Sequence, residues 1–394
     1  MGDRLRFGIF MAPFHPAGQN PTLALHRDLR LIEHLDWLGY DEAWVGEHHS
    51  AGFELIASPE IFLATAAERT RRIKLGTGVV SLSYHNPLWA ADRIVLLDHL
   101  TRGRVMFGVG PGALPTDSIM IGIEPEQTRL ILEQNFDVVM RLLTSPEPVT
   151  AAGHQYELHE ARLHLRPYSD PLFDIAVAAV ASPSGPRLAG KYGVGLLSIG
   201  ATLAAGFDAL ALHWNVMKER AATFGTTVDR DKWRLVGLVH AAESREQAYK
   251  DVEFGIEAWF RYFQRVAAFP QMVVLGGNIR EMIDFVNTSG VGAIGTVDDV
   301  VAQIGRLKEQ SGGFGAYLLL AHEWANPVAT HRSYELIAQY VMPEFQGSAV
   351  SLVDAKQRAE GAREELAAKS MAAVDAMRAR HEAELATSAR TVRP

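Results

Sequence analysis

The sequence has no cysteine among its 394 residues. This absence excludes disulfide bonds, thiolate catalysis and zinc sites built on cysteine. The sequence also has no apolar run approaching the ~20 residues that a membrane-spanning helix needs. The N-terminus leads directly into a strand pattern and lacks the long apolar stretch of a secretory signal. We therefore expect a cytoplasmic protein that has no membrane partner.

An excess of positive charge is lacking as well, because 46 acidic residues outnumber 38 basic ones and the formal net charge is -8. Nucleic-acid-binding proteins usually carry a basic face, so we expect no nucleic-acid partner. Hydrophobic residues make up 48% of the chain and charged residues 21%, the balance of a globular protein with a large core. This composition suits an enzyme that acts on a neutral substrate.

What the chain does contain is a repeated order of strand, loop and helix. Alternation of this kind implies a parallel sheet, and eight such units imply closure into a (β/α)8 TIM barrel. A doubly wound open sheet is the alternative. The eight expected strands cover residues 5–12, 41–45, 73–80, 104–109, 174–180, 195–199, 233–240 and 315–321.

Two regions depart from this repeat. Residues 146–171 contain prolines and scattered polar residues, and we expect an irregular insertion there. Residues 347–394 are rich in Ala, Glu, Arg and Lys, which predicts one or two helices outside the barrel. We therefore divide the chain into a barrel domain, 1–346, and a helical C-terminal extension, 347–394. The extension is either a solvated tail or an arm that packs on a second subunit.

The motif Glu47-His48-His49 closes the second expected strand. In a parallel barrel the carboxyl ends of the strands carry the chemistry. Adjacent strand residues point in opposite directions, so one of the two histidines faces the barrel mouth. They are poorly placed as metal ligands, because a catalytic zinc needs about three convergent ligands. An imidazole here could donate a proton or a hydrogen bond, with a purely structural histidine as the alternative.

The other strand ends are mostly small and apolar, which favours a flat, largely apolar ligand. Glycines in 110–112 and 182–185 let the main chain approach that ligand. Ser184 to Arg187 begin a helix whose free N–H groups could hold a phosphate, with Arg187 in support, unless this is a plain capping turn. The expected apolar lining is Met11, Phe14, Phe53, Leu114 and Trp324. The polar residues assigned to surfaces are Asp117, His154, His159, His164 and His213.

Several motifs together resemble the luciferase-like flavin monooxygenase superfamily, over about residues 5–345. Within it, residues 108–117 and 181–190 are similar to the limonene monooxygenase group. The motifs that carry the resemblance cover residues 7–10, 44–49, 73–78, 86–87, 97–104 and 107–110.

The resemblance implies a two-component FMN-dependent monooxygenase on a TIM barrel. A separate flavin reductase would supply reduced FMN, which would react with O2 to a C4a-(hydro)peroxyflavin and oxygenate a hydrophobic small molecule such as a terpenoid. The family's usual homodimer is built through helices expected at 59–71 and 88–100. Two alternatives stay open: a deazaflavin (F420)-dependent oxidoreductase on the same barrel, and a non-catalytic flavin-binding protein.

The resemblance also implies roles for individual residues, with no metal site. His48 matches the family's catalytic histidine, and Gly78-Val79 matches a strained strand end beside the flavin ring, often with a cis peptide. Luciferase has cysteine and arginine where this chain has Gly110 and Pro111, so the phosphate contact moves to the 181–185 loop. The implied cofactor-binding residues are Ala12, Gly78, Val79, Gly110, Ala181, Ser182, Ser184 and Gly185.

Overall fold

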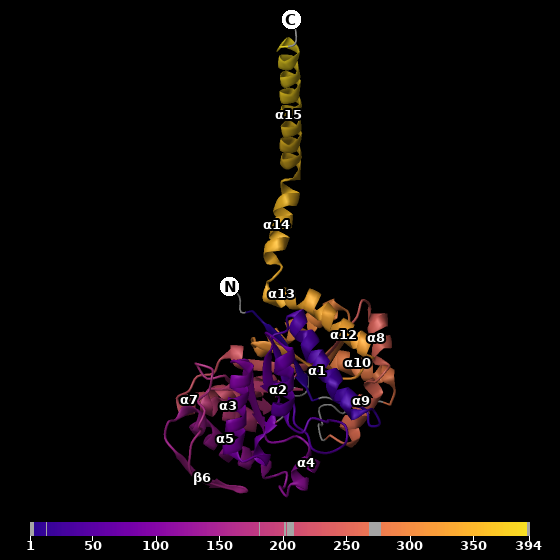
Figure 1. Cartoon of the computed structure of the whole chain (residues 1–394). Coiled ribbons are helices and arrows are strands. Elements are labelled where there is room, and N and C mark those ends of the chain that lie inside the picture. Colours follow the sequence, from indigo (N-terminus) through magenta and orange to yellow (C-terminus); the bar gives the residue numbers. More distant parts are fainter. Residues whose placement is uncertain are drawn as a thin grey trace. The chain divides into compact units, whose positions relative to one another are not determined.

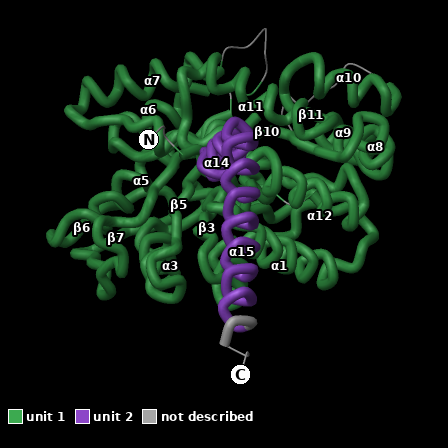
Figure 2. The backbone as a smooth tube through the Cα atoms, turned by 90° about the horizontal axis from the view of Figure 1, so that it is seen from above, with its two compact units in different colours: residues 1–346 green, residues 347–394 purple. Residues whose placement is uncertain are grey.

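The structure is a computed structural model that describes residues 4–12, 14–180, 182–200, 202, 209–267 and 277–391. Contacts divide the chain into two compact units, residues 1–346 and residues 347–394, which are coloured differently in Figure 2. Unit 1 carries every strand found in the described part of the chain.

Eight parallel strands in the described part of unit 1 form a closed ring. Strand β10 pairs with both β9 and β12, and this double pairing joins the two ends of the sheet. The predicted barrel is therefore confirmed, and the open-sheet alternative is wrong. In order around the ring, the strands are β12 (Ala316–Leu320), β1 (Arg6–Met11), β2 (Glu42–Val45), β3 (Lys74–Thr77), β5 (Val105–Gly110), β8 (Asp174–Ala179), β9 (Gly195–Ile199) and β10 (Trp233–Ala241).

Helices connect these strands and cover the outside of the ring (Figure 1). Three of them begin with a proline that directly follows an asparagine, and the side chains of Asn20, Asn86 and Asn326 accept hydrogen bonds from N–H groups of the first turn. The helices of unit 1 are α1 (Pro21–Leu38), α2 (Pro59–Arg69), η1 (Leu82–Tyr84), α3 (Pro87–Thr101), α4 (Pro115–Met120), α5 (Thr128–Thr144), α6 (Ser184–Tyr192), α7 (Ala209–Phe224), η2 (Arg230–Lys232), α8 (Arg245–Val252), α9 (Ile256–Arg265), α10 (Ile279–Ser289), α11 (Val297–Ser311), α12 (Pro327–Leu336), η4 (Ile337–Val341) and α13 (Met342–Gln346).

Side chains fill the interior of the barrel, because alternate residues of each strand point inward. Trp44 lies fully buried at mid-height and packs with inward residues of other strands, such as Met106 and Leu197. Gly76 leaves room for it, since a Cβ there would stand 2.5 Å from the indole ring. The outward strand residues form a second core with the surrounding helices.

The amino ends of the strands are closed by a buried ion cluster. Arg234 on β10 donates to both carboxylate oxygens of Glu42 on β2, at 2.7 and 3.1 Å, and reaches Asp174 on β8 at 3.1 Å. Burial opposes the ionisation of Glu42, but the charge of Arg234 lowers the pKa of that carboxyl to about 2. The cluster therefore ties strands on different sides of the ring to one another.

The structure adds elements that the sequence did not suggest, and it corrects the irregular insertion expected at residues 146–171. Residues 146–171 include an antiparallel hairpin, β6 (Val149–Gly153) and β7 (Tyr156–Ala161), at the edge of unit 1 (Figure 1). Strand β11 (Gly292–Gly295), which the sequence did not suggest, pairs with the last residues of β10. After β10, residues 245–265 form two separate helices, since α8 ends at Val252 and α9 begins at Ile256. A short strand β4 (Val80–Ser81) also pairs in parallel with the last residues of β5.

Unit 2 contains the helices α14 (Val350–Gly361) and α15 (Arg363–Thr391). The described side chains of both helices are exposed. Within the described ranges of the two units, the helices are too short or too polar for any of them to cross a membrane.

Candidate functional site

A cavity of about 320 Å³ opens at the carboxyl ends of the strands, on top of the uppermost inward residues of the barrel. Its volume falls in the range of small-molecule sites, roughly 300–1,000 Å³. The walls are mostly apolar, and a few polar groups stand among them. The lining residues are Phe10, Ala12, Glu47, His48, Glu54, Gly78, Val79, Ser81, Pro111, Gly112, Ala113, Arg129, Ala178, Ala179, Val180, Ser182, Ser184, Ile199, Phe263 and Leu320.

His48 is the histidine that faces this cavity, and its ring lies between two carboxylates. Nε2 is 2.8 Å from Oε2 of Glu54, and Nδ1 is 3.2 Å from Oδ2 of Asp117. Both acidic side chains are almost completely buried. Asp117, on α4, also accepts from the backbone N–H of His49 and from the hydroxyl of Ser50.

This arrangement keeps the His48 imidazole charged. Burial by itself would lower the pKa of His48, but the negative charge of Glu54 and the hydrogen bond to Asp117 raise it to about 10. Burial likewise opposes ionisation of the two acids, yet the nearby imidazolium lowers the pKa of each carboxyl. The cavity wall therefore holds a fixed cation flanked by two anions.

His49 points away from His48, into a second polar cluster behind the rim. Oε1 of the buried Glu47 accepts from His49 Nε2 at 2.7 Å and from His85 Nε2 at 2.8 Å, and Oε2 accepts from the backbone N–H of Ser81. Burial opposes the charge on Glu47, but these hydrogen bonds, above all that of His49, lower its pKa to about 2. This cluster fixes the loop that follows β2.

The structure brings most of the expected cofactor-binding residues to the cavity. Ala12, Gly78, Val79, Ser182 and Ser184 line it, together with His48. The Gly78-Val79 peptide bond is cis, as the resemblance implied.

Gly110 and Gly185 do not line the cavity, and Ala181 lies outside the described residues. Both glycines instead allow a close approach within the protein. A Cβ on Gly110 would stand 2.7 Å from the Val79 side chain, and a Cβ on Gly185 would stand 2.4 Å from the carbonyl oxygen of Ala178. They therefore act by seating Val79 and by letting α6 pack against β8.

The match to known proteins covers most of the chain. The family model described as luciferase-like monooxygenase matches residues 5–313. The chain belongs to the luciferase-like monooxygenase family.

Two curated relatives are close to this luciferase-like monooxygenase. Limonene 1,2-monooxygenase from Rhodococcus erythropolis is 49% identical over 348 residues, 87% of each chain. The 4-hydroxyprotoasukamycin monooxygenase of Streptomyces nodosus subsp. asukaensis is 46% identical over 88% of this chain and 94% of its own. A solved structure, the oxygenating constituent of 3,6-diketocamphane monooxygenase from Pseudomonas putida in complex with FMN, superposes with a TM-score of 0.72 at 26% identity, covering 86% of this chain and 98% of the other.

Two residues assigned to the surface of this luciferase-like monooxygenase are in fact buried. Asp117 is 1% exposed and binds His48, and His213 is 0% exposed on α7. His213 Nδ1 lies 2.9 Å from the Ser198 hydroxyl, and burial lowers the pKa of its imidazole to about 4. His213 is therefore a neutral core residue away from the cavity.

The expected apolar lining was wrong as well. None of the five proposed residues lines the large cavity; Leu114 and Trp324 pack in the core, and Met11 and Phe14 border a smaller cavity. The apolar walls come from other inward positions, such as Phe10, Ile199 and Leu320.

Three functional candidates were missed by sequence reasoning: Glu54, Arg129 and Tyr262. Glu54 follows His48 by six positions, and the intervening turn folds back so that the two side chains meet. Arg129 lies at the start of α5 and lines the cavity, whereas Arg187 is exposed and does not. No short-range pattern marks these residues, because only the folding of a turn or of distant segments brings their side chains to the site.

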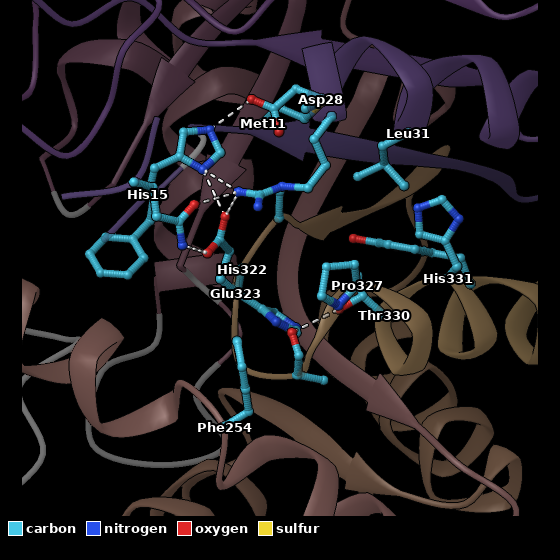
Figure 3. Close-up of a pocket in the computed structure, with 16 residues that line it drawn as sticks. Met11, His15, Asp28, Leu31, Phe254, His322, Glu323, Pro327, Thr330 and His331 are labelled. Atoms are coloured by element: carbon cyan, nitrogen blue, oxygen red, sulfur yellow. Dashed lines mark hydrogen bonds and ion pairs between the residues drawn. The ribbon is translucent and has the colours of Figure 1, made fainter. Parts of the chain in front are cut away.

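The smaller cavity, of about 80 Å³, lies between α1, α12 and the ends of β1 and β12 (Figure 3). At one side, His15 bridges Asp28 and Glu323, each at 2.8 Å, and Arg27 pairs with Glu323. We call these four residues the His15 clasp. It ties the loop after β1 to the loop after β12. Among the described residues, no group of three His, Asp or Glu side chains is placed to hold a metal ion.

The charge on His48 predicts a pH-dependent contribution to stability. The pKa is about 10 in the folded protein against an ordinary 6.5, so the stabilisation is complete below about pH 6.5 and is lost as the pH rises through 10. We expect the difference in unfolding free energy between the wild type and His48→Gln, measured by urea denaturation, to be largest near pH 6 and to shrink steadily toward pH 10. His159→Gln, on the exposed hairpin, is the control and should follow the wild type throughout. A difference that stays constant with pH would contradict a charged His48.

Proposed function

We propose that this chain is the oxygenating component of a two-component FMN-dependent monooxygenase. It would take reduced FMN from a separate flavin reductase and use O2 to oxygenate a hydrophobic small molecule of terpenoid type. The observation that carries the proposal is one cavity in which a fixed imidazolium, the cis Gly78-Val79 strand end and a hydroxyl-rich helix start face the same space. The limonene-acting relative at 49% identity and the FMN-bound structural neighbour support it.

The polar groups at one side of the cavity fit a phosphate. Ser182 and Ser184 stand at the start of α6, with their hydroxyl oxygens 2.8 Å apart, where free N–H groups and the helix dipole favour an anion. Arg129 lines the same cavity and adds a positive charge. These residues would hold the FMN phosphate, in place of the Gly110 and Pro111 positions.

The apolar walls fit the flat ring of the cofactor and a hydrocarbon substrate. Gly78 and Val79 present backbone and a small side chain on one side, while Phe10, Ile199 and Leu320 form the floor. Glu54 Oε2 is buried and has no hydrogen-bond donor among the described residues, so a polar acceptor is left for a ligand. The residues present therefore fit FMN.

The chemistry would be divided between cofactor and protein. Reduced FMN, when bound, supplies the electrons that activate O2. His48 would hold its Nε2 proton toward the cavity and stabilise negative charge on an oxygen atom placed there. The apolar walls would exclude water and orient the substrate. Activated oxygen would then react with the substrate and not be lost in side reactions with water.

The exposed apolar side chains of α2 and α3 support the homodimer that the family resemblance implied. Ile61 is 72% exposed, Trp89 63% and Leu96 49%, although these helices pack directly on the barrel. Contiguous exposed apolar side chains often mark a protein interface. Light scattering after size exclusion should give twice the chain mass for the wild type and one chain mass for Trp89→Glu. Trp37→Glu is the matched control, because Trp37 on α1 is 75% exposed. A Trp89→Glu protein of unchanged mass would rule out this interface.

The phosphate site predicts a selective loss of affinity. Removing Arg129 (Arg129→Gln) or both hydroxyls (Ser182→Ala with Ser184→Ala) should weaken FMN binding roughly ten- to a hundredfold, because charge-assisted hydrogen bonds are lost. Riboflavin, which lacks the phosphate, should bind these variants and the wild type equally. Fluorescence titration with both flavins measures this. Arg187→Gln is the control, because Arg187 lies on α6 with Ser184 but is exposed outside the cavity. Equal losses of affinity for FMN and riboflavin would place the phosphate elsewhere.

The activity itself is tested with labelled oxygen. With reduced FMN, ¹⁸O2 and a panel of monocyclic terpenes that includes limonene, we expect a product that carries one ¹⁸O atom. His48→Ala should lower turnover roughly tenfold or more, in line with general acid–base contributions, and His159→Ala should not. Reduced deazaflavin should give no oxygenated product. Terpene oxidation without ¹⁸O, or full turnover in His48→Ala, would contradict the proposal.

A further inference from the structure

Glu54 makes the shorter of the two ion-pair contacts of His48, yet the proposed function gives it no role in the charge or orientation of the His48 ring. Its carboxylate is buried and lines the cavity, and Oε2 lies 2.8 Å from His48 Nε2. That oxygen nevertheless has no hydrogen-bond donor among the described residues, because the contact is an ion pair without hydrogen-bond geometry. The Nε2 proton is therefore attracted to Glu54 without being aligned on it.

Glu54 is held in place from three sides. The Tyr262 hydroxyl, on α9, donates to Oε1 at 2.6 Å. The backbone of Glu54 forms a β-bridge with Phe14, in the loop after β1. The backbone N–H of His48 donates to the carbonyl oxygen of Ile56 at 3.0 Å, which folds the Glu54 segment back against the rim.

The β-bridge between Glu54 and Phe14 and the hydroxyl of Tyr262 are themselves held in place by an aromatic cluster. The ring centroids of Phe14, Phe53 and Tyr262 are 4.9 to 5.3 Å apart, within the range of favourable aromatic pairs. The loop that carries Phe14 is anchored by the His15 clasp (Figure 3). The backbone N–H of His15 also donates to the carbonyl oxygen of Phe53 at 2.9 Å. Such packing leaves the Glu54 carboxylate little freedom to turn away.

We propose that Glu54, oriented by Tyr262, is a further positioning residue of this site: it keeps the His48 ring cationic and holds its Nε2 proton at the cavity wall. Asp117 holds the opposite nitrogen. The inference deepens the proposed function and rests on it only for what the proton of His48 does there.

The geometry separates the tasks of the two acids. Asp117 Oδ2 is a hydrogen-bond partner of Nδ1 and fixes the plane of the ring. Glu54 supplies charge beside Nε2 without taking its hydrogen bond, so the N–H, fixed in the plane of the ring, stays available to an oxygen atom of a ligand. With Glu54 neutral, the ring would keep one anion instead of two, and the neutral imidazole would become accessible near physiological pH.

Several titratable groups surround the His48 ring, and a measured pKa of His48 could reflect any of them. Glu54 and Asp117 touch His48, and His49 is its neighbour in the chain, with Glu47 on the far side of His49. Tyr262 and Tyr84 face these carboxylates, and burial raises the pKa of both phenols, so they stay neutral in the working range. A change in the His48 pKa on altering Glu54 therefore reports this pair.

The test is a titration of the flavin-free protein labelled with ¹⁵N-histidine and followed by NMR, with the His48 signals assigned by their loss in His48→Gln. Glu54→Gln should lower the pKa of His48 by roughly one to three pH units, the effect of one opposite charge at this distance. Tyr262→Phe keeps the ring packing and removes only the hydroxyl, and it should lower the pKa in the same direction by less. Tyr249→Phe, on the neighbouring helix α8, should leave it unchanged.

An unchanged His48 pKa in Glu54→Gln would overturn the proposal. If that variant does not fold by circular dichroism, Tyr262→Phe decides alone, and an unchanged pKa there overturns it. A shift in Glu54→Gln with none in Tyr262→Phe would overturn the role given to Tyr262. Since no flavin is present, these results do not depend on whether the protein binds FMN.

A kinetic measurement on the active enzyme gives a second readout. The upper limb of the pH profile of kcat should move to lower pH in Glu54→Gln, while KM for the terpene changes less than twofold.

Discussion

The paired charges of Glu42 and Arg234 tie together the amino ends of strands on different sides of the barrel. A buried ion pair of this kind is stable only while both partners and their hydrogen bonds stay in place, so it fixes the relative position of the strands it joins. Strand β2 carries Glu42 at one end and leads into Glu47-His48-His49 at the other. The position of His48 at the rim therefore depends on how β2 is held at the floor.

Above this floor, the size of the inward side chains decides where space is left. Trp44 fills the middle of the barrel because Gly76 presents no side chain to it, and the next layer up, with Gly78 and Ala178, is too small to fill the mouth. The cavity is thus a consequence of residue volume. The groups that give it chemical character come from loops: His48 between its two acids, and the serines at the start of α6. A luciferase-like monooxygenase built in this way combines a largely apolar cavity with a fixed imidazolium in its wall.

The sequence predicted the parts that follow from periodicity and local motifs. The eight barrel strands, the placement of His48 at a strand end and the helix that begins at Ser184 all rest on short-range patterns, and the structure agrees with each. It failed where distant segments meet. Asp117 looked like a surface acid because nothing local shows that α4 folds against the β2 loop. Glu54 and Tyr262 are 208 positions apart and meet only after the barrel closes. The β6–β7 hairpin was missed because its flanking prolines suggested irregular chain.

The most direct test of the account is a crystal structure of the protein with FMN. We expect the flavin ring beside Gly78 and Val79, the phosphate on Ser182, Ser184 and Arg129, and Nε2 of His48 within hydrogen-bond distance of the ring edge or of a ligand beside it. FMN bound outside this cavity, or a His48 ring turned away from the bound flavin, would contradict it.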